Sequence, residues 1–145
     1  MRGFRLLGVL LVLLSATSVG SAKAEGRSIL IAVTQPSIQD YQPEAKDGSP
    51  CRVLTVANPI RERGTAQVIV RDESDKIVAV KTLDDGTANA PMKDSFLRCN
   101  VLTDIAVPDS AFYVVYLDDY YITTVDASRL PMEESDRISM DYPNP

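Results

Sequence analysis

The sequence predicts an all-β protein of one domain, with about seven short antiparallel strands packed as two sheets and one disulfide. Three observations support this prediction. Apolar and polar residues alternate over short stretches, which is the period of a half-buried strand. Clusters of Pro, Gly, Asp and Ser separate these stretches. No stretch of any length has the apolar period of an amphipathic helix.

Residues 1–24 have the layout of a secretory signal peptide. Arg2 and Arg5 precede a short apolar run, and 22–24 has the small-x-small pattern that signal peptidase cuts. The apolar run is shorter than the roughly 20 residues that a membrane-spanning helix needs. We therefore expect export as 25–145, to the periplasm or the exterior, without membrane insertion.

Charge limits the partners of the exported chain. The whole sequence has 15 Lys and Arg against 20 Asp and Glu. Arg2, Arg5 and Lys23 belong to the signal segment, which leaves 12 basic residues against 20 acidic ones and a formal charge of −8. A domain this acidic repels nucleic acid and anionic membranes, so neither is an expected partner.

The cysteines and the missing histidines restrict the chemistry. Cys51 and Cys99 are the only cysteines, and in an exported protein they are expected to form a structural disulfide. The sequence contains no histidine. It therefore lacks the commonest general base and the commonest zinc ligand, and an enzyme built on it would depend on carboxylates, Lys or Tyr. We expect no enzymatic activity, no metal and no cofactor.

The expected strands follow from alternation and turn signals along the chain. They are 28–34, 51–57, 65–71, 77–83, 96–107, 111–117 and 120–125. A long Pro-rich loop is expected at 35–50, and a loop of small residues at 84–95. After 126 the alternation fails, so the predicted sandwich domain is 25–126 and 127–145 is predicted to be a loose acidic tail.

Alternation also predicts which side chains point inward. Cys99 shares a face with Val101 and Ile105, and Cys51 shares one with Val53. Both cysteines therefore point into the core, and a buried bond between the second and fifth strands fits. Residues 111–117 are apolar on both faces, which is typical of a central strand.

The segment Asp109-Ser110-Ala111-Phe112-Tyr113 resembles the D-x-A-x-Y tyrosine corner of immunoglobulin-type domains. The resemblance implies an immunoglobulin-like sandwich with Asp109 at the corner and a hydrogen bond from the Tyr113 hydroxyl to backbone between 104 and 108. It also implies that the two cysteine strands are neighbours in one sheet. The chain departs from that family at Val115, where the family has a core cysteine, and it contains no tryptophan.

A broader resemblance links the chain to uncharacterised small secreted bacterial β-sandwich proteins. It rests on motifs at 64–72, 83–86, Cys99 and 107–113, and it covers about half of the exported chain. It implies a common fold and no particular activity.

The predicted function is a secreted, non-catalytic module that binds another protein through its loops, as a monomer or weak dimer. Antiparallel strands sort the loops onto two ends, and one end combines tyrosines with mixed charge. There tyrosines would supply contact area, and aspartates would steer a basic partner. The candidate binding patch consists of Asp118, Asp119, Tyr120, Tyr121, Asp84, Asp85, Arg61 and Arg63.

Two alternatives use the same fold. Calcium takes 6–8 oxygen ligands, which clustered loop carboxylates can supply, so a calcium-stabilised surface domain is one. The sequence nevertheless has no D-x-D-x-D-G spacing. The other is a small secreted hydrolase or enzyme inhibitor. A glycosidase needs two carboxyls about 5–10 Å apart, whereas the neighbouring Asp118 and Asp119 are expected to point to opposite sides.

Overall fold

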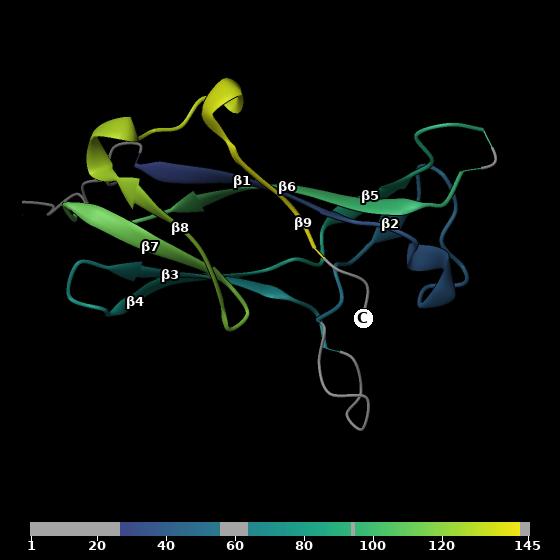
Figure 1. Ribbon diagram of the computed structural model, residues 1–145, viewed down its shortest axis with the longest axis horizontal. Helices are drawn as coiled ribbons and strands as arrows, with labels where there is room; N and C mark the ends of the chain where they lie inside the picture. Colours follow the sequence, from purple (N-terminus) through teal and green to yellow (C-terminus); the bar gives the residue numbers. More distant parts are fainter. Residues whose placement is uncertain (1–26, 56–63, 94, 143–145) are drawn as a thin grey trace, which may run out of the picture.

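The computed structural model describes residues 27–55, 64–93 and 95–142, and shows an all-β sandwich of two sheets (Figure 1). The predicted fold class is confirmed. The strands are β1 (Ser28–Gln35), β2 (Pro50–Cys51), β3 (Gln67–Asp72), β4 (Ile77–Thr82), β5 (Gly86–Asn89), β6 (Arg98–Ala106), β7 (Phe112–Leu117), β8 (Tyr120–Asp126) and β9 (Ile138–Asp141). Three 3₁₀ turns are η1 (Ile38–Asp40), η2 (Ala127–Arg129) and η3 (Glu134–Asp136). Among these residues no helix is long and apolar enough to cross a membrane.

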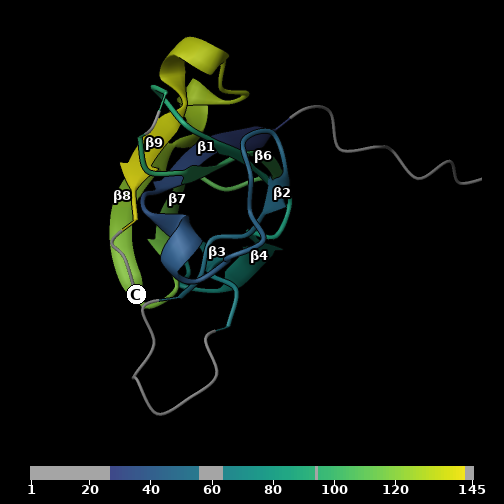
Figure 2. The same ribbon diagram turned by 90° about the vertical axis from the view of Figure 1, so that its right-hand side faces the viewer.

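The strands form a five-stranded and a four-stranded sheet. The first has the order β2-β5-β6-β1-β9 and the second the order β4-β3-β7-β8. All neighbours are antiparallel except β1 and β9, which are parallel. Viewed end-on, the sheets face each other with β8 and β9 on the same side of the sandwich (Figure 2).

The core lies between the sheets and comes from the alternation that the sequence shows. In β1 the side chains of Ile29, Ile31 and Val33 are buried, and each pairs with a residue of β6. On the facing sheet, β3 and β7 contribute Val68 and Val115, both fully buried. Burying one valine-sized side chain stabilises a fold by roughly 1.5–3 kcal/mol, so these alternating strands supply the main driving force for the sandwich.

The predicted strand 51–57 is largely absent, and side chains hold part of its backbone. Only Pro50–Cys51 pairs with a strand, and Leu54 forms a single bridge with Thr65. The buried Gln35 side chain accepts from the Leu54 N–H and donates to the Leu54 carbonyl, both at 2.9 Å. The Gln35 side chain thus bonds to Leu54 as a strand would, while Val53 and Thr55 bond to other backbone groups. Residues 56–57 lie outside the described part of the chain.

Gln42 repeats this arrangement at the surface. Its side chain donates to the Arg52 carbonyl at 2.8 Å and accepts from the Arg52 N–H at 3.1 Å. The loop predicted at 35–50 is therefore held against the segment 52–54 by two amides that each satisfy one donor and one acceptor.

The disulfide between Cys51 and Cys99 is confirmed, with Cα atoms 5.8 Å apart. The two cysteine strands are not direct neighbours, contrary to the prediction. β5 lies between β2 and β6 in the sheet, and its residues belong to the expected loop 84–95. Gly86 of β5 faces the bond. A Cβ at this position would come within 2.6 Å of the Cys99 Sγ and 3.0 Å of the Cys51 Sγ. The sheet accommodates the bond because this residue has no side chain.

The prediction of a loose tail after 126 is wrong for 127–142. β9 adds to the edge of β1, and Met132 and Tyr142 are buried. The Tyr142 hydroxyl donates to an Asp118 carboxylate oxygen at 2.6 Å. The segment therefore crosses from the four-stranded to the five-stranded sheet and closes one side of the sandwich (Figure 1). The turn residues and acidic residues around 138–141 hid this short strand in the sequence.

The Tyr113 hydroxyl donates a hydrogen bond to the carbonyl oxygen of Pro108, five residues upstream. This bond lies where the resemblance to the tyrosine corner places it. Asp109 does not share in it: its carboxylate is exposed and pairs with Arg27 at 3.1 Å. Tyr113 is fully buried, so its ring packs in the core while its hydroxyl holds the chain before β7.

Tyr113→Phe should lower the free energy of unfolding by about 1 kcal/mol, the usual net contribution of one such hydrogen bond. Chemical denaturation measures it. The matched control is Tyr116→Phe, which removes a hydroxyl from a half-buried ring in the same strand and should leave stability within about 0.5 kcal/mol of the parent. If both variants are as stable as the parent, the hydroxyl of Tyr113 does not fix the corner.

Candidate functional site

The structure brings part of the predicted binding patch to one end of the four-stranded sheet. Pairing of Gln67 with Thr82 and of Val68 with Leu117 places the end of β4 beside the β7–β8 turn. Asp84 is exposed there, and Asp85 forms an ion pair with Lys81 at 3.2 Å. Arg61 and Arg63 of the predicted patch lie outside the described residues.

Asp118 is committed to the fold, which corrects its expected role as a free surface charge. It has a left-handed backbone, with φ of 51°. One carboxylate oxygen accepts from the Gln67 N–H at 2.9 Å, and the other accepts from the Tyr142 hydroxyl. The side chain therefore joins three distant segments of the chain. Its neighbour Asp119 remains exposed.

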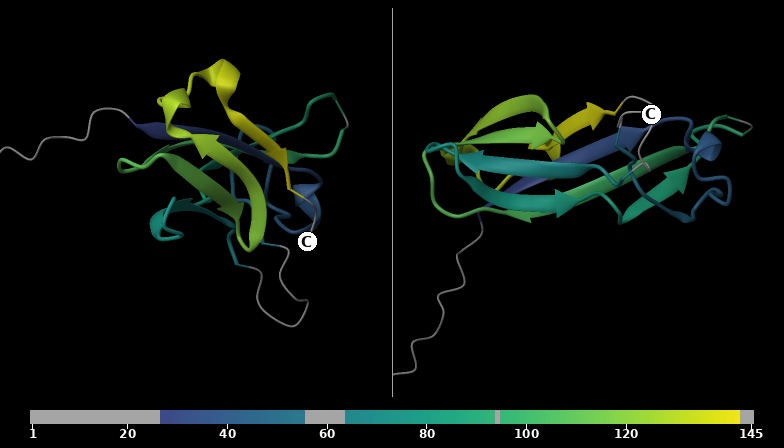
Figure 3. Two further views of the ribbon diagram at one scale, coloured as in Figure 1. Left: turned by 60° about the vertical axis from the view of Figure 1, so that its left-hand side comes forward. Right: turned by 90° about the horizontal axis from the view of Figure 1, so that it is seen from below.

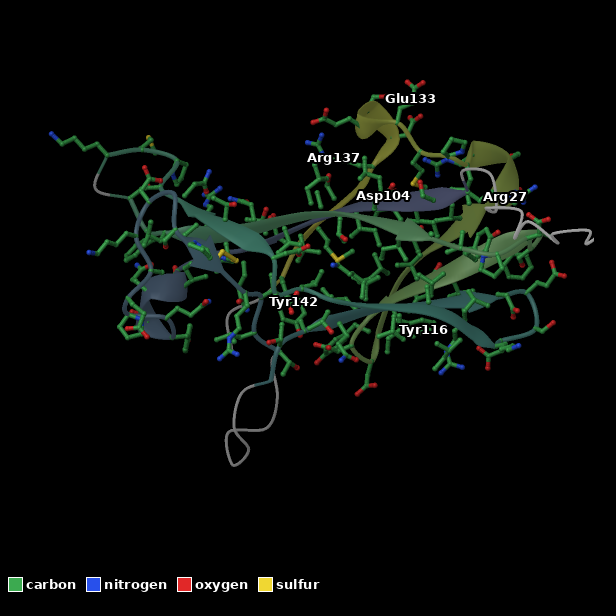
Figure 4. The ribbon with its side chains drawn as sticks, turned by 180° about the vertical axis from the view of Figure 1, so that it is seen from behind. Arg27, Asp104, Tyr116, Glu133, Arg137 and Tyr142 are labelled. Carbon is green, nitrogen blue, oxygen red and sulfur yellow. A yellow bond between two sulfur atoms is a disulfide. The ribbon has the colours of Figure 1, made fainter. Side chains whose placement is uncertain are left out.

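Tyr120 and Tyr121 are both exposed, at 60% and 59%, but they lie on opposite faces of β8. The Tyr121 ring packs edge-to-face on Tyr116, with centroids 6.2 Å apart. Tyr120 instead lines an apolar hollow of about 140 Å³ between the two sheets, together with Leu117, Ile122, Met140 and Tyr142. Figure 4 labels Tyr116, on which Tyr121 packs, and Tyr142, which lines the same hollow as Tyr120. Tyr120 and Tyr121 therefore do not form one continuous patch.

A row of apolar and aromatic side chains crosses the side of the four-stranded sheet that faces away from the five-stranded sheet. We call this side the outer face. Register pairs Val80 with Ile69, Ile69 with Tyr116, and Tyr116 with Tyr121, one residue from each strand. Val80 is 52% exposed. The right-hand view of Figure 3 shows the sandwich from the side of this sheet. This outer row was missed in the sequence because either face of β4 could have been the inward one.

Arg71 lies beside the outer row. Its guanidinium carbon is 5.8 Å from the centre of the Tyr116 ring, within the range of a cation–π contact. The same guanidinium donates to the Asp75 backbone carbonyl at 2.9 Å and is 3.4 Å from the Asp75 carboxylate. These contacts hold a long flexible side chain flat on the sheet. A shallow groove of about 350 Å³ is lined by Ile69, Arg71, Asp75, Tyr116, Asp118 and Asp119.

Asp126 ends β8 and caps the turn η2. Its carboxylate accepts from the Ser128 N–H at 2.8 Å. Hydrogen bonds from Ser128 lower the pKa of the Asp126 carboxyl, and the charge of Arg129 acts in the same direction. The residue serves local structure at the far end of β8 from the patch.

Within 27–55, 64–93 and 95–142, no three carboxylates or thiols come together in a way that could hold a metal ion. Comparison of the chain with protein-family models, with curated proteins and with solved structures gives no match. The resemblance to small secreted bacterial proteins stays a prediction.

Proposed function

We propose that this chain is a secreted, non-catalytic β-sandwich that binds another protein through the outer face of its four-stranded sheet. The observation that carries the proposal is the outer row, which spans all four strands and remains exposed at Val80 and Tyr121. Exposed apolar residues are common singly, but a connected row next to a fixed charge is typical of an interaction surface.

The chemistry of the outer face supports a protein partner. Tyrosine and arginine are enriched at the centres of protein interfaces, because both supply large contact area and directional bonds. Tyr116, Tyr121 and Arg71 lie in contact here. The groove has no deep, enclosed part that would bury a small molecule, and its floor is the flat surface of a sheet.

Charge around the outer face supports a basic partner. Asp119 and Asp84 are exposed at one end, and Asp75 at the other. The exported chain carries a formal charge of −8, so its field steers positively charged proteins toward it. Such steering weakens as salt rises, since the Debye length is about 8 Å at physiological ionic strength.

The absence of histidine from the sequence supports a non-catalytic role. Asp118, one of the carboxylates that line the groove, already accepts two hydrogen bonds from the fold. Its two oxygens are thereby engaged in holding the β7–β8 turn to β3 and to the C-terminal segment.

A double variant, Val80→Ser with Tyr121→Ser, should lower partner affinity about tenfold or more, because truncating an aromatic hot-spot residue costs about 2 kcal/mol or more. The measurement is capture of partners from the native exported fraction, identification by mass spectrometry, and titration of the captured protein against each variant. Both positions are exposed, so circular dichroism and thermal unfolding should remain close to those of the parent.

The matched control is Leu102→Ser with Met92→Ser. These side chains are 56% and 72% exposed and lie off the outer face, Leu102 on β6 of the other sheet and Met92 in the loop after β5. The control should bind as the parent does. If the Val80 and Tyr121 variant binds the partner as tightly as the parent, the binding site lies elsewhere. If both double variants lose the same affinity, the loss comes from placing more serine on the surface and not from the outer face.

A further inference from the structure

The four-stranded sheet ends in two open edges, β4 on one side and β8 on the other. Among the described strands, each of these has a single hydrogen-bonded neighbour. An open edge presents backbone N–H and C=O groups that can pair with another strand. β4 contains no proline and exposes Ile77 and Val80, at 47% and 52%. Both edges can therefore accept a further strand.

The hydrogen bonds at the two ends of β4 show which backbone groups point outward. Leu83 N–H donates to Ala66, and Asp72 N–H donates to Lys76, so these pairs are the hydrogen-bonded ones. Hydrogen-bonded and non-hydrogen-bonded pairs alternate along an antiparallel ladder, with one bulge between Val70 and Arg71. Val80 and Ile77 therefore belong to non-hydrogen-bonded pairs, and their N–H and C=O groups point to the open edge.

The same reasoning applies to β8. Ala127 N–H donates to Ala111, which makes Thr124 a member of a non-hydrogen-bonded pair. At the other end, Leu117 and Tyr120 pair directly across a two-residue turn, which requires that they exchange hydrogen bonds. Tyr121, the next residue, is then non-hydrogen-bonded to β7. The backbone groups of Tyr121 and Thr124 point to the open edge of β8.

The two edges match in spacing and direction. Outward-pointing residues are three apart on both, because each ladder contains a bulge. β4 and β8 run antiparallel to each other within the sheet, so a second copy in the same orientation brings its β4 antiparallel to β8. Tyr121 then pairs with Val80 of the next copy, and Thr124 with Ile77. The first of these pairs continues the outer row from one copy into the next.

Charge distinguishes this arrangement from pairing of like edges. Two β4 edges aligned through Val80 and Ile77 would bring Lys76 directly opposite Lys81. Two β8 edges aligned through Tyr121 and Thr124 would bring Asp119 directly opposite Asp126. Like charges directly opposite each other destabilise a pair of strands. Each edge therefore repels its own kind.

Pairing of unlike edges avoids the lysine pair and the Asp119–Asp126 pair that like edges would form. In the register above, Lys81 of one copy lies opposite Tyr120 of the other, and Lys76 lies opposite Val125. Asp75 would come opposite Asp126, but its carboxylate already has Arg71 as a partner. The like-charge pair of this register therefore lies beside a guanidinium, whereas the like-charge pairs of the other two arrangements do not.

We propose that copies of this chain associate head to tail, the β4 edge of one copy adding as a strand to the β8 edge of the next. The partner at both edges is a second copy of the same chain. Such a contact is heterologous and leaves one free edge of each kind, so the assembly grows with concentration beyond a dimer. The inference uses the backbone groups of the two edges, although Val80 and Tyr121 also belong to the outer row, and it holds whether or not the outer face binds another protein.

Sedimentation of the purified, disulfide-bonded protein tests the proposal with two edge-blocked variants. Val80→Pro and Tyr121→Pro each remove an N–H that points to an open edge, the position at which a strand tolerates proline. The parent should form species larger than a dimer as concentration rises. Each variant alone should be monomeric. An equimolar mixture should form a one-to-one dimer, because each variant keeps the edge that the other lacks.

Three results would overturn the proposal: a parent that remains monomeric at millimolar concentration, a mixture that remains monomeric, or a single variant that still dimerises, which would show pairing of like edges. Should a proline variant unfold, crosslinking replaces it. Ile77→Cys with Thr124→Cys in one chain should give a ladder of oxidised multimers, since paired Cα atoms about 5.5 Å apart suit a disulfide. Each cysteine alone should give no more than dimers. If the doubly substituted chain gives no disulfide-linked multimers, the register is wrong.

Discussion

Gln35→Met should lower the free energy of unfolding by about 2–5 kcal/mol. Methionine keeps the length of the side chain but cannot hydrogen-bond to the backbone. The N–H and C=O of Leu54 would then be left without partners in the core, where the residue is only 3% exposed. Each buried group that loses its partner costs about 1–3 kcal/mol. Chemical denaturation with an unchanged m-value measures the loss.

Gln42→Met is the matched control. It removes an equivalent pair of hydrogen bonds, to Arg52, but at the surface, where water replaces them. The expected loss is below about 1 kcal/mol. If the two variants lose the same stability, burial of the amide does not determine its contribution, and the segment 52–54 is held by other contacts.

The second large effect concerns Gly86 and the disulfide. Gly86→Ala should destabilise the protein by about 2–3 kcal/mol, because the added Cβ would come within 2.6 Å of the Cys99 Sγ and 2.9 Å of a Val101 methyl group. Replacing both cysteines by alanine should cost about 4 kcal/mol, on the chain-entropy model for a sequence separation of 48.

Combining these changes tests the cause. Without the two sulfur atoms, Gly86→Ala meets only the Val101 methyl group at close range, so its cost should fall by about 1–2 kcal/mol. The four proteins form a double-mutant cycle measured by denaturation under non-reducing conditions. Additive losses would show that the glycine is required for a reason other than the proximity of the disulfide. The control Gly48→Ala tests backbone strain alone, because Gly48 has a φ of 82° and no atom within 4 Å of an added Cβ.

Features that depend on the alternation of neighbouring residues were predictable from the sequence. The strands 28–34, 65–71 and 111–117 correspond to β1, β3 and β7. In β1 and β3 the buried residues are those on the expected faces, whereas β7, apolar on both faces in the sequence, buries only Tyr113, Val115 and Leu117. The disulfide could be inferred from Cys51 and Cys99 alone, since an exported chain with two cysteines has one possible pair. Alternation is local, so a few residues suffice to show it.

The candidate site was predictable only in part. The exposure of Tyr120 and Tyr121 agrees with the hypothesis, but their separation onto two faces of β8 required the register with β7. Asp118 looks like any other turn residue in the sequence. Its partners, Gln67 and Tyr142, are 51 and 24 residues away, and hydrogen bonds over such separations leave no local pattern.

By itself the sequence determined that the chain forms short alternating strands with one disulfide between inward-pointing cysteines. Only the tertiary structure decided the rest: the amide of Gln35 in place of a strand partner, β9 as an edge strand, and the outer row across four strands. The physical reason is that a strand's period depends on its own residues. Its neighbours, its register and the partner of each buried polar group depend on residues far along the chain that folding brings alongside.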